Sequence, residues 1–368
     1  MDEQKWIIVS NRLPLHFDKA SGEVKPSSGG LVTAVNGIKT NHEKIWLGAA
    51  DNDLASHLDP KSRKTKKKGV TDYQAIVVEE ELFDDYYNGY CNDTLWPMLH
   101  YESELARHVS EKWDAYVEVN KRFAEAIHQT AGKGDLVWIH DFHLFLVPGL
   151  LKSLKKNYRV GFFLHVPFPS SEVFRQLPSR NEILKSLLAA DLIGFHDYSY
   201  LRHFASSVYT TLGIETDMYS ISHEGHSARL GVFPVGIDTP SVAKKAASAG
   251  VKKEIADLEK HNITPMLVLG VDRLDYIKGI DLKFRAFGRM LELYPDLRGK
   301  VRLLQIAVPS RTDVDVYKAL RSKLEEMVGS INGEFGSISY TPIQYVFSSI
   351  PLTQFAHSAH HQPAGLLP

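Results

Sequence analysis

Two positively charged side chains come shortly after an apolar run in the second half of the chain. Residues 265–270 are typical of a buried strand, and the stretch VDRLDYIKG after them carries Arg273 and Lys278 on a predicted loop. Arg311 follows another predicted strand and precedes a predicted helix over 313–329, whose N-terminal dipole favours negative charge. Cations held on a rigid scaffold are suited to bind an anion. These three residues therefore predict an anion site, with Arg311 placed for a phosphate.

The N-terminal part of the chain offers a second candidate anion site. Arg12 ends the tripeptide Ser-Asn-Arg directly after the first predicted strand, and residues 27–30, Ser-Ser-Gly-Gly, directly precede the first predicted helix. Paired glycines, here ending at Gly30, let a phosphate approach the backbone N–H groups at a helix N-terminus. The pattern indicates a phosphate cradle, with a plain glycine turn as the alternative.

Aromatic and hydrogen-bonding residues alternate between residues 86 and 101. Tyr87 and Trp96 belong to this cluster, together with Asn88 and His100. A pyranose ring offers C–H faces and hydroxyl edges, so aromatic faces beside polar groups are typical of a sugar site. Core packing of the aromatic rings is the competing interpretation.

An aspartate and several histidines stand at the ends of two further predicted strands. Asp141 lies in the stretch WIHDFH and His165 in the stretch FFLHVPFP. Adjacent strand ends bring such side chains together as an acid/base pair, as groups that bind hydroxyls, or as a metal site. The i, i+4 helical spacing of zinc sites is absent, which disfavours a metal. The pair Asp313 and Asp315 resembles a DxD metal motif, but capping of the predicted helix explains it better.

Short apolar runs alternate with longer amphipathic stretches along the chain, which predicts an α/β fold. The predicted strands cover residues 6–9, 44–47, 75–78, 136–140, 160–165, 192–195, 231–234, 267–271, 301–307 and 341–347. The predicted helices cover residues 31–39, 113–131, 144–155, 170–177, 181–190, 198–212, 280–293 and 313–329. Proline and glycine near residue 240, and the restart of the pattern, predict two doubly wound Rossmann-like domains that face a ligand-binding cleft. Their predicted ranges are 1–238 and 239–355.

Composition excludes several classes of protein. The chain has 368 residues, 43% of them hydrophobic, and a net charge of -1, so no global field attracts nucleic acid or an anionic membrane. A single cysteine, Cys91, and an N-terminus without a signal-peptide pattern predict a cytoplasmic protein. No apolar run reaches the ~18 residues of a membrane-spanning helix. The basic run over 61–69 is predicted to be a solvated loop.

Taken together, these motifs resemble the trehalose-6-phosphate synthases, a family of retaining GT-B glycosyltransferases. The resemblance covers residues 1 to about 355. It is carried, in order, by IIVSNRLP, SSGGLVTAV, YYNGYCNDTLWPMLHY, VWIHDFHL, GFFLHVPFPSSEVFRQLP, VDRLDYIKG, LLQIAVPSRTDV and INGEFGSISYTPIQY. An ordered series of this length is far more specific than any single motif.

The resemblance implies an enzyme that moves glucose from UDP-glucose to glucose 6-phosphate with retention, giving trehalose 6-phosphate and UDP. It implies no cofactor. On the donor side, Arg273 and Lys278 match the clamp on the leaving diphosphate, whose developing charge two fixed cations stabilise without a divalent metal. Gly30 also matches the donor side, and His165 matches a contact to the donor glucose.

On the acceptor side, the resemblance implies that Arg12, Tyr87, Trp96 and Arg311 hold the phosphorylated sugar. Asp141 matches the carboxylate that orients the acceptor sugar, so it is implied to act in catalysis with the two diphosphate-binding cations. The family further implies a front-side attack, in which the departing phosphate takes the proton of the acceptor.

The resemblance ends after Ala356, and a segment similar to DGMNLVAKEY, which follows in family members, has no counterpart in the chain. We therefore expect an incomplete second domain, an unstructured tail over 356–368, and a donor site too incomplete for turnover. Two other functions fit the motifs, a glucosylglycerol-phosphate synthase that takes glycerol 3-phosphate, and a non-catalytic synthase-like regulatory subunit. Besides the two substrates, a homo-oligomer or a complex with a trehalose-phosphate phosphatase stays open.

Overall fold

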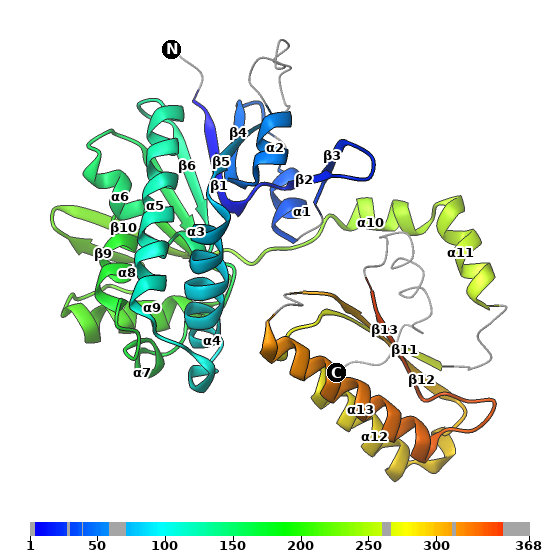
Figure 1. Cartoon of the computed structure of the whole chain (residues 1–368). Helices are drawn as coiled ribbons and strands as arrows, with labels where there is room; N and C mark the ends of the chain where they lie inside the picture. The colour runs from blue at the N-terminus through cyan, green and yellow to red at the C-terminus, as the bar shows by residue number, and fades with distance from the viewer. Residues whose placement is uncertain are drawn as a thin grey trace. The chain divides into compact units, whose positions relative to one another are not determined.

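The chain folds into two compact units. The computed structural model describes residues 4–27, 30–38, 40–58, 71–259, 266–310 and 314–348. Contacts between Cα atoms divide the chain into the units Met1–Ile237 and Asp238–Pro368. Figure 1 shows the helices and strands of each unit.

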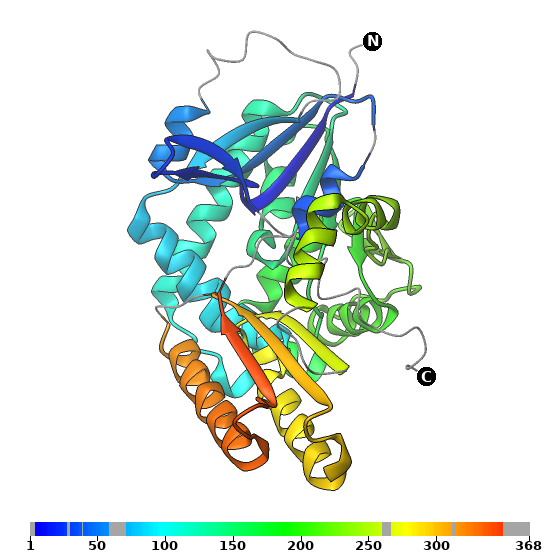
Figure 2. The ribbon, with the colours of Figure 1, turned by 90° about the vertical axis from the view of Figure 1, so that its right-hand side faces the viewer.

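The first unit is built on one large sheet. Its strand order is β5-β4-β1-β6-β7-β8-β10-β9, and all neighbours are parallel except β9 and β10. The strands are β1 (Trp6–Arg12), β4 (Lys44–Ala50), β5 (Thr71–Val77), β6 (Leu136–His140), β7 (Arg159–Phe163), β8 (Leu192–Phe195), β9 (Ser220–His223) and β10 (His226–Val232). A separate antiparallel hairpin, β2 (Leu15–Asp18) and β3 (Glu23–Pro26), lies beside a short helix, α2 (Asn52–His57), as Figure 2 shows.

Helices connect these strands and supply much of the core. They are α1 (Gly30–Asn36), α3 (Glu80–Asp84), α4 (Trp96–Leu99), α5 (Ser110–Thr130), α6 (Val147–Ser153), α7 (Ser171–Phe174), α8 (Arg180–Leu187) and α9 (Tyr198–Leu212). The apolar residues of α5 recur at helical spacing, so one stripe that includes Tyr116, Phe123 and Ile127 is fully buried. Each such side chain contributes roughly 1.5 to 3 kcal/mol of burial free energy. The long helix α5 thereby fixes one side of the sheet.

Local sequence determines several of these elements closely. The predicted bounds of β6, β8 and α9 are confirmed, since apolar runs buried on both faces favour parallel strands and Asp197 and Gly213 cap α9. The prediction for 144–155 is wrong at its start. A 3-10 turn occupies Phe142–Leu144 and α6 begins only at Val147.

Other elements differ from the sequence prediction because they depend on distant pairing. The strand predicted over 231–234 is β10, which begins at His226 because a turn through Gly225 pairs it with β9. A π-helix over Asp85–Leu95, the β2–β3 hairpin and the helices α2 and α3 are not indicated by periodicity. π-helical segments are rare and often occur at functional sites.

An irregularity in β1 aims Arg12 away from the sheet. Val9 pairs with Leu47 and Arg12 with Ala49, so β1 carries one extra residue between these pairs. The strand predicted to end at Val9 therefore continues through Arg12. A Cβ atom on Gly48 of β4 would lie 2.5 Å from the backbone N of Leu13 and 2.6 Å from the carbonyl C of Arg12. Gly48 is thus required for the close approach of the bulged strand.

Replacing Gly48 with alanine is expected to destabilise the first unit by about 1 to 3 kcal/mol, because backbone atoms must move to admit the methyl group. All five tryptophans of the chain lie in this unit, so tryptophan fluorescence during urea unfolding measures its stability selectively. Gly161→Ala on β7 is the matched control, since its Cβ would meet only Trp138 Cδ1, at 3.7 Å. Equal stability of the two variants would contradict the role of Gly48.

The second unit contains a smaller parallel sheet. Its described strands have the order β11-β12-β13, with β11 (Met266–Arg273), β12 (Val301–Val308) and β13 (Ile343–Phe347). The helices are α10 (Thr239–Ala246), α11 (Ala249–Glu259), α12 (Ile280–Leu293) and α13 (Asp315–Phe335). Residues of α12 and α13 pack on the sheet in a core that includes Phe284, Leu324 and Leu303. The predicted bounds of α12 are confirmed.

Candidate functional site

A cavity of about 1030 Å³ opens in the first unit at the carboxyl ends of β1, β4 and β6. Its walls come from the end of β1, the β2–β3 hairpin, the starts of α1 and α2, the α3 segment with the π-helix, and the loop after β6. Ligands of parallel sheets bind at the carboxyl ends of the strands, so the cavity lies where such a fold is expected to bind. The cavity brings together Arg12, Tyr87 and Asp141 from the sequence prediction.

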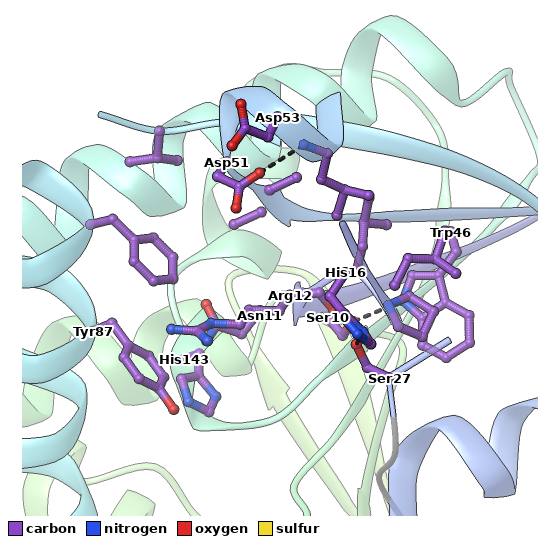
Figure 3. A pocket seen from close by; sticks show the side chains of 18 of the residues that line it. Ser10, Asn11, Arg12, His16, Ser27, Trp46, Asp51, Asp53, Tyr87 and His143 are labelled. Atoms are coloured by element: carbon purple, nitrogen blue, oxygen red, sulfur yellow. Dashed lines mark hydrogen bonds between the residues drawn. The ribbon is translucent and has the colours of Figure 1, made fainter. Parts of the chain in front are cut away.

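Arg12 and three aromatic rings form one wall of this cavity. The guanidinium carbon of Arg12 lies 5.1 Å from the ring centre of Phe83 and 4.6 Å from that of Tyr87. Tyr87 stacks on Phe83 at 5.6 Å and on His143 at 5.8 Å. Figure 3 shows Arg12, Tyr87 and His143 converging, with Asp51 and Asp53 at another side. The stacked rings hold the guanidinium in place by cation–π contact and leave its edge open.

The charges in the cavity wall leave Arg12 ready for an anion. Asp53 pairs with Lys19 at 3.0 Å, and Glu79 pairs with Arg122. Arg12 is exposed, and no carboxylate of the described residues forms an ion pair with it. A planar guanidinium of this kind binds phosphate or carboxylate oxygens in pairs.

Side chains from distant elements keep the bulge below Arg12 in place. The Oγ of Ser10 donates to the carbonyl of Arg12 at 2.8 Å and accepts a hydrogen bond from Nε1 of Trp46, also at 2.8 Å. The hydroxyl of Tyr86 donates to Oδ1 of Asn11 at 2.9 Å. Ser10 and Asn11 are buried, so these hydrogen bonds hold the strand end rigidly.

Asp141 occupies a backbone conformation that non-glycine residues rarely adopt. Its φ is 76° and its ψ is 167°, a region open almost only to glycine and costing about 1 to 3 kcal/mol. The Oδ1 of Asp141 accepts from the backbone N–H of His165 at 3.2 Å, and its own N–H donates to the carbonyl of Phe163 at 2.8 Å. Strain of this kind persists only where the surroundings impose it, and it is typical of functional sites.

The loop after Asp141 is held by buried polar side chains. The Tyr116 hydroxyl donates to the carbonyl of Phe142 at 2.6 Å and accepts from the N–H of Phe145 at 3.1 Å. The amide of Asn120 donates to the carbonyl of His143 at 3.1 Å and accepts from the N–H of Leu146 at 3.2 Å. Both side chains come from α5 and are fully buried. Their hydrogen bonds supply the constraint that sustains the strained residue.

Three histidines gather at the carboxyl ends of β6, β7 and β8. The Nδ1 of His140 lies 3.0 Å from the Nε2 of His165, and the ring of His196 lies 5.6 Å from that of His165. The predicted meeting of the two strand ends is therefore confirmed. Burial lowers the pKa of His140 well below its usual value, and burial and His196 lower the pKa of His165 to about 4. Both rings are neutral at pH 7.

These low pKa values make the stability of the first unit depend on pH. The unfolded chain binds protons at these histidines near pH 6.5, whereas the folded chain does not until about pH 4 at His165. Stability is therefore full above pH 6.5 and is lost as the pH falls toward 4, by up to about 1.4 kcal/mol per pH unit per histidine. We expect urea unfolding at pH 5 to need less denaturant than at pH 7. The loss should be smaller in His165→Asn, and an equal loss in both proteins would contradict this origin.

The other predicted residues of the first unit lie outside the cavity wall. Trp96 is only 5% exposed, and its ring packs on His100 and Phe142. Gly30 begins α1, whose next two residues line the cavity. Residues 28 and 29 of the predicted phosphate cradle lie outside the described residues.

The predicted cations of the second unit lie at the end of its first strand. Arg273 is the last residue of β11 and pairs with Val308, so the prediction that it lies on a loop is wrong. Lys278 ends a 3-10 turn that is capped by the buried Asp275, whose Oδ1 accepts from the N–H of Ile277 at 3.3 Å. Gly279 follows with a φ of 58° and is the N-cap residue of α12. These features fix the backbone that carries Lys278.

Several other predicted positions are not described. Arg311 and Asp313, the side chain of Asp315, the basic run over 61–69 and the tail over 356–368 lie outside the described residues. Where the chain is described, no cluster of three or more His, Cys, Asp or Glu side chains could hold a metal ion. Over the same residues, no helix is long and apolar enough to cross a membrane.

Sequence patterns missed two residues of the aromatic wall. Phe83 lies four positions before Tyr87 on the α3 segment, a spacing that places the two rings side by side. The motif WIHDFH contains His143 but does not indicate that its ring stacks on Tyr87. Both could have been found from helical spacing and from the shared strand end, respectively.

The fold and the site together define a class of protein. The first unit is a doubly wound α/β unit, and Arg12, unpaired among the described residues, lines a cavity at the carboxyl ends of its strands. A smaller parallel α/β unit follows in the sequence. A family model described as glycosyltransferase family 20 matches residues 4–362. The chain belongs to this family. The match reaches beyond residue 355, where the motif resemblance was expected to end.

Relatives with known names support this assignment. The chain is 42% identical over 352 residues to alpha,alpha-trehalose-phosphate synthase [UDP-forming] A of Dictyostelium discoideum, covering 94% of this chain and 47% of that protein. It is 41% identical over 366 residues to the alpha,alpha-trehalose-phosphate synthase [UDP-forming] of Candida albicans, covering 96% and 76%. The chain thus spans about half the length of the first relative and about three quarters of the second.

Solved structures agree with this result. A Burkholderia xenovorans alpha,alpha-trehalose-phosphate synthase in complex with glucose-6-phosphate superposes with a TM-score of 0.84 at 30% identity, covering 96% of this chain and 77% of that one. An Escherichia coli structure described as trehalose-6-phosphate bound with UDP-2-fluoro glucose gives 0.83 at 31% identity, covering 96% and 75%. The predicted GT-B fold class is confirmed by these similarities.

Proposed function

We propose that the chain belongs to an enzyme that transfers glucose from UDP-glucose to glucose 6-phosphate with retention, forming trehalose 6-phosphate and UDP. The observation that carries this proposal is the arrangement of Arg12, Tyr87 and Asp141 in one cavity. An unpaired guanidinium beside an aromatic face suits a sugar phosphate, and a carboxylate in the wall of the same cavity suits a sugar hydroxyl. The similarity to a synthase structure in complex with glucose-6-phosphate supports the same acceptor.

The site residues take complementary roles in this proposal. Arg12, Tyr87, Trp96 and Arg311 hold the acceptor, and Asp141 orients the acceptor hydroxyl toward the donor sugar. The attacking hydroxyl oxygen forms a bond to C1 of the donor glucose while the bond from C1 to the phosphate oxygen breaks. The proton of the hydroxyl passes to the departing phosphate on the same face, which retains the configuration at C1.

Four residues are proposed to bind the donor. His165 and Gly30 contact the donor side, and Arg273 and Lys278 stabilise the negative charge that develops on the leaving diphosphate. A lysine on a rigid turn suits this role because it needs no rearrangement during the reaction. Besides the two substrates, the proposed partners are a second copy of the chain or a trehalose-phosphate phosphatase. The proposed location is the cytoplasm.

Titration calorimetry and a UDP-release assay test this function. We expect the chain to bind glucose 6-phosphate in preference to glycerol 3-phosphate or glucose, and any UDP release from UDP-glucose to depend on glucose 6-phosphate. Mass spectrometry of the product would identify a disaccharide phosphate. Preference for glycerol 3-phosphate would indicate a glucosylglycerol-phosphate synthase, and binding without UDP release would indicate a donor site that does not support turnover, as in a non-catalytic subunit. The relatives and solved structures give no support to either alternative.

A further inference from the structure

His140, His165 and His196 lie side by side at the carboxyl ends of β6, β7 and β8, and we call them the histidine column. Two of them share a hydrogen bond between neutral imidazoles. His140 is the last residue of β6 and is 1% exposed, and His165 follows the end of β7. The Nδ1 of His140 and the Nε2 of His165 are 3.0 Å apart. One nitrogen must donate and the other must accept, so the tautomers of the two rings are coupled.

The buried nitrogen of His140 decides which ring donates. Its Nε2 is shielded from solvent and has no hydrogen-bond partner among the described residues. A proton there would be an orphaned buried donor, which proteins avoid more strictly than an unpaired acceptor. The proton of His140 therefore resides on Nδ1 and is donated to Nε2 of His165. Since His165 is also neutral, its own proton is on Nδ1.

Two further contacts keep the ring of His165 in position. Its backbone N–H donates to Oδ1 of the strained Asp141 at 3.2 Å. On its other side lies the ring of His196, whose Nδ1 accepts from the N–H of Val235 at 3.4 Å. In the described part of the chain, Nδ1 of His165 has no hydrogen-bond partner. It is therefore free to donate to an added ligand.

We propose that His140 is a positioning residue that holds His165 as the Nδ1–H tautomer, so that His165 donates a hydrogen bond to a hydroxyl oxygen of the donor sugar. The tautomer assignment rests on the 3.0 Å contact between the two rings, on the buried and unpartnered Nε2 of His140, and on the neutrality of both rings. The identity of the ligand rests on the proposed function. A fixed tautomer matters because an imidazole with its proton on the other nitrogen would present a lone pair where a donor is needed.

Nitrogen-15 NMR of the whole chain, labelled at histidine, tests the assignment at pH 7. Long-range proton–nitrogen correlations separate protonated from unprotonated ring nitrogens, and His165 is identified by the signals lost in His165→Asn. We expect Nδ1 of His165 in the protonated range and Nε2 in the unprotonated range. The opposite pattern in the wild-type chain would overturn the proposal without any variant.

Two replacements of His140 separate positioning from packing. His140→Asn keeps an N–H donor near the place of Nδ1, so the His165 signals should stay as in the wild type. His140→Phe removes the donor but keeps a ring, so the Nδ1 signal of His165 should shift toward the unprotonated range. Equal spectra for His165 in the two variants would contradict the proposal. If His140→Phe does not fold, the wild-type and His140→Asn spectra still decide the question.

A distant histidine serves as the matched control. His226 bonds through Nε2 to the carbonyl of Ala190 at 3.0 Å and lies outside the column. His226→Asn should leave the His165 signals unchanged. None of these readouts needs turnover, so failure of the transferase proposal and failure of the tautomer assignment are distinguishable. Retained UDP release with a reversed tautomer would reject only the role of His140.

Discussion

Replacing Arg12 with alanine is expected to weaken glucose 6-phosphate binding by roughly 10- to 150-fold. A charge-assisted hydrogen bond is worth roughly 1.5 to 3 kcal/mol, and 1.4 kcal/mol corresponds to a factor of ten in affinity. The guanidinium forms no ion pair within the described residues, so its whole hydrogen-bonding capacity is available to the ligand. Titration calorimetry measures the change directly. The fold should persist, because Arg12 is exposed and contributes its cation–π contacts at the surface of the cavity.

Two companion variants make this experiment specific. Arg12→Lys keeps the charge but loses the planar fork and the stacking on Tyr87, so an intermediate affinity is expected. Lys19→Ala removes another cation of the same cavity, which is already paired with Asp53 at 3.0 Å, and should leave the affinity unchanged. Equal losses of affinity in Arg12→Ala and Lys19→Ala would mean that the phosphate responds only to the total positive charge of the cavity and not to a direct contact with Arg12.

At position 141, replacement by glycine is expected to give a more stable protein than replacement by alanine, which reverses the usual order of stability. In ordinary helices and strands glycine is less stable than alanine by roughly 0.5 to 1 kcal/mol. At Asp141, with φ of 76° and ψ of 167°, glycine relieves a strain of about 1 to 3 kcal/mol that alanine retains. Asp141→Gly should therefore unfold at a higher urea concentration than Asp141→Ala, measured by tryptophan fluorescence. Both variants lose the carboxylate and should bind glucose 6-phosphate weakly.

A pair of variants on α9 controls for the general effect of glycine. Arg202 is exposed within this helix, so Arg202→Ala should be more stable than Arg202→Gly by about 1 kcal/mol. If Asp141→Ala proves as stable as Asp141→Gly, the backbone is not strained at this position. If both Asp141 variants keep the wild-type affinity, the carboxylate does not contact the acceptor.

Much of the scaffold could be predicted from local sequence. Runs such as those of β6 and β8, and the caps of α9, specify their own structure because the period of apolar residues and the ends of a helix depend only on near neighbours. The same logic placed polar residues at the carboxyl ends of parallel strands. It therefore predicted that the segments containing Asp141 and His165 would meet, as their hydrogen bond shows.

The working geometry of the site was decided by tertiary structure. Arg12 is oriented by a bulge opposite Gly48. Its guanidinium is held by the rings of Phe83 on α3 and of Tyr87 on the π-helix that follows, and no periodicity indicates either element. The strain at Asp141 and the His140 hydrogen bond likewise arise only after the sheet has assembled. The sequence thus determined which residue types stand at the strand ends. Their orientation depends on contacts between residues far apart in the chain, because a close approach or a strained backbone is imposed by neighbours that the local pattern does not specify.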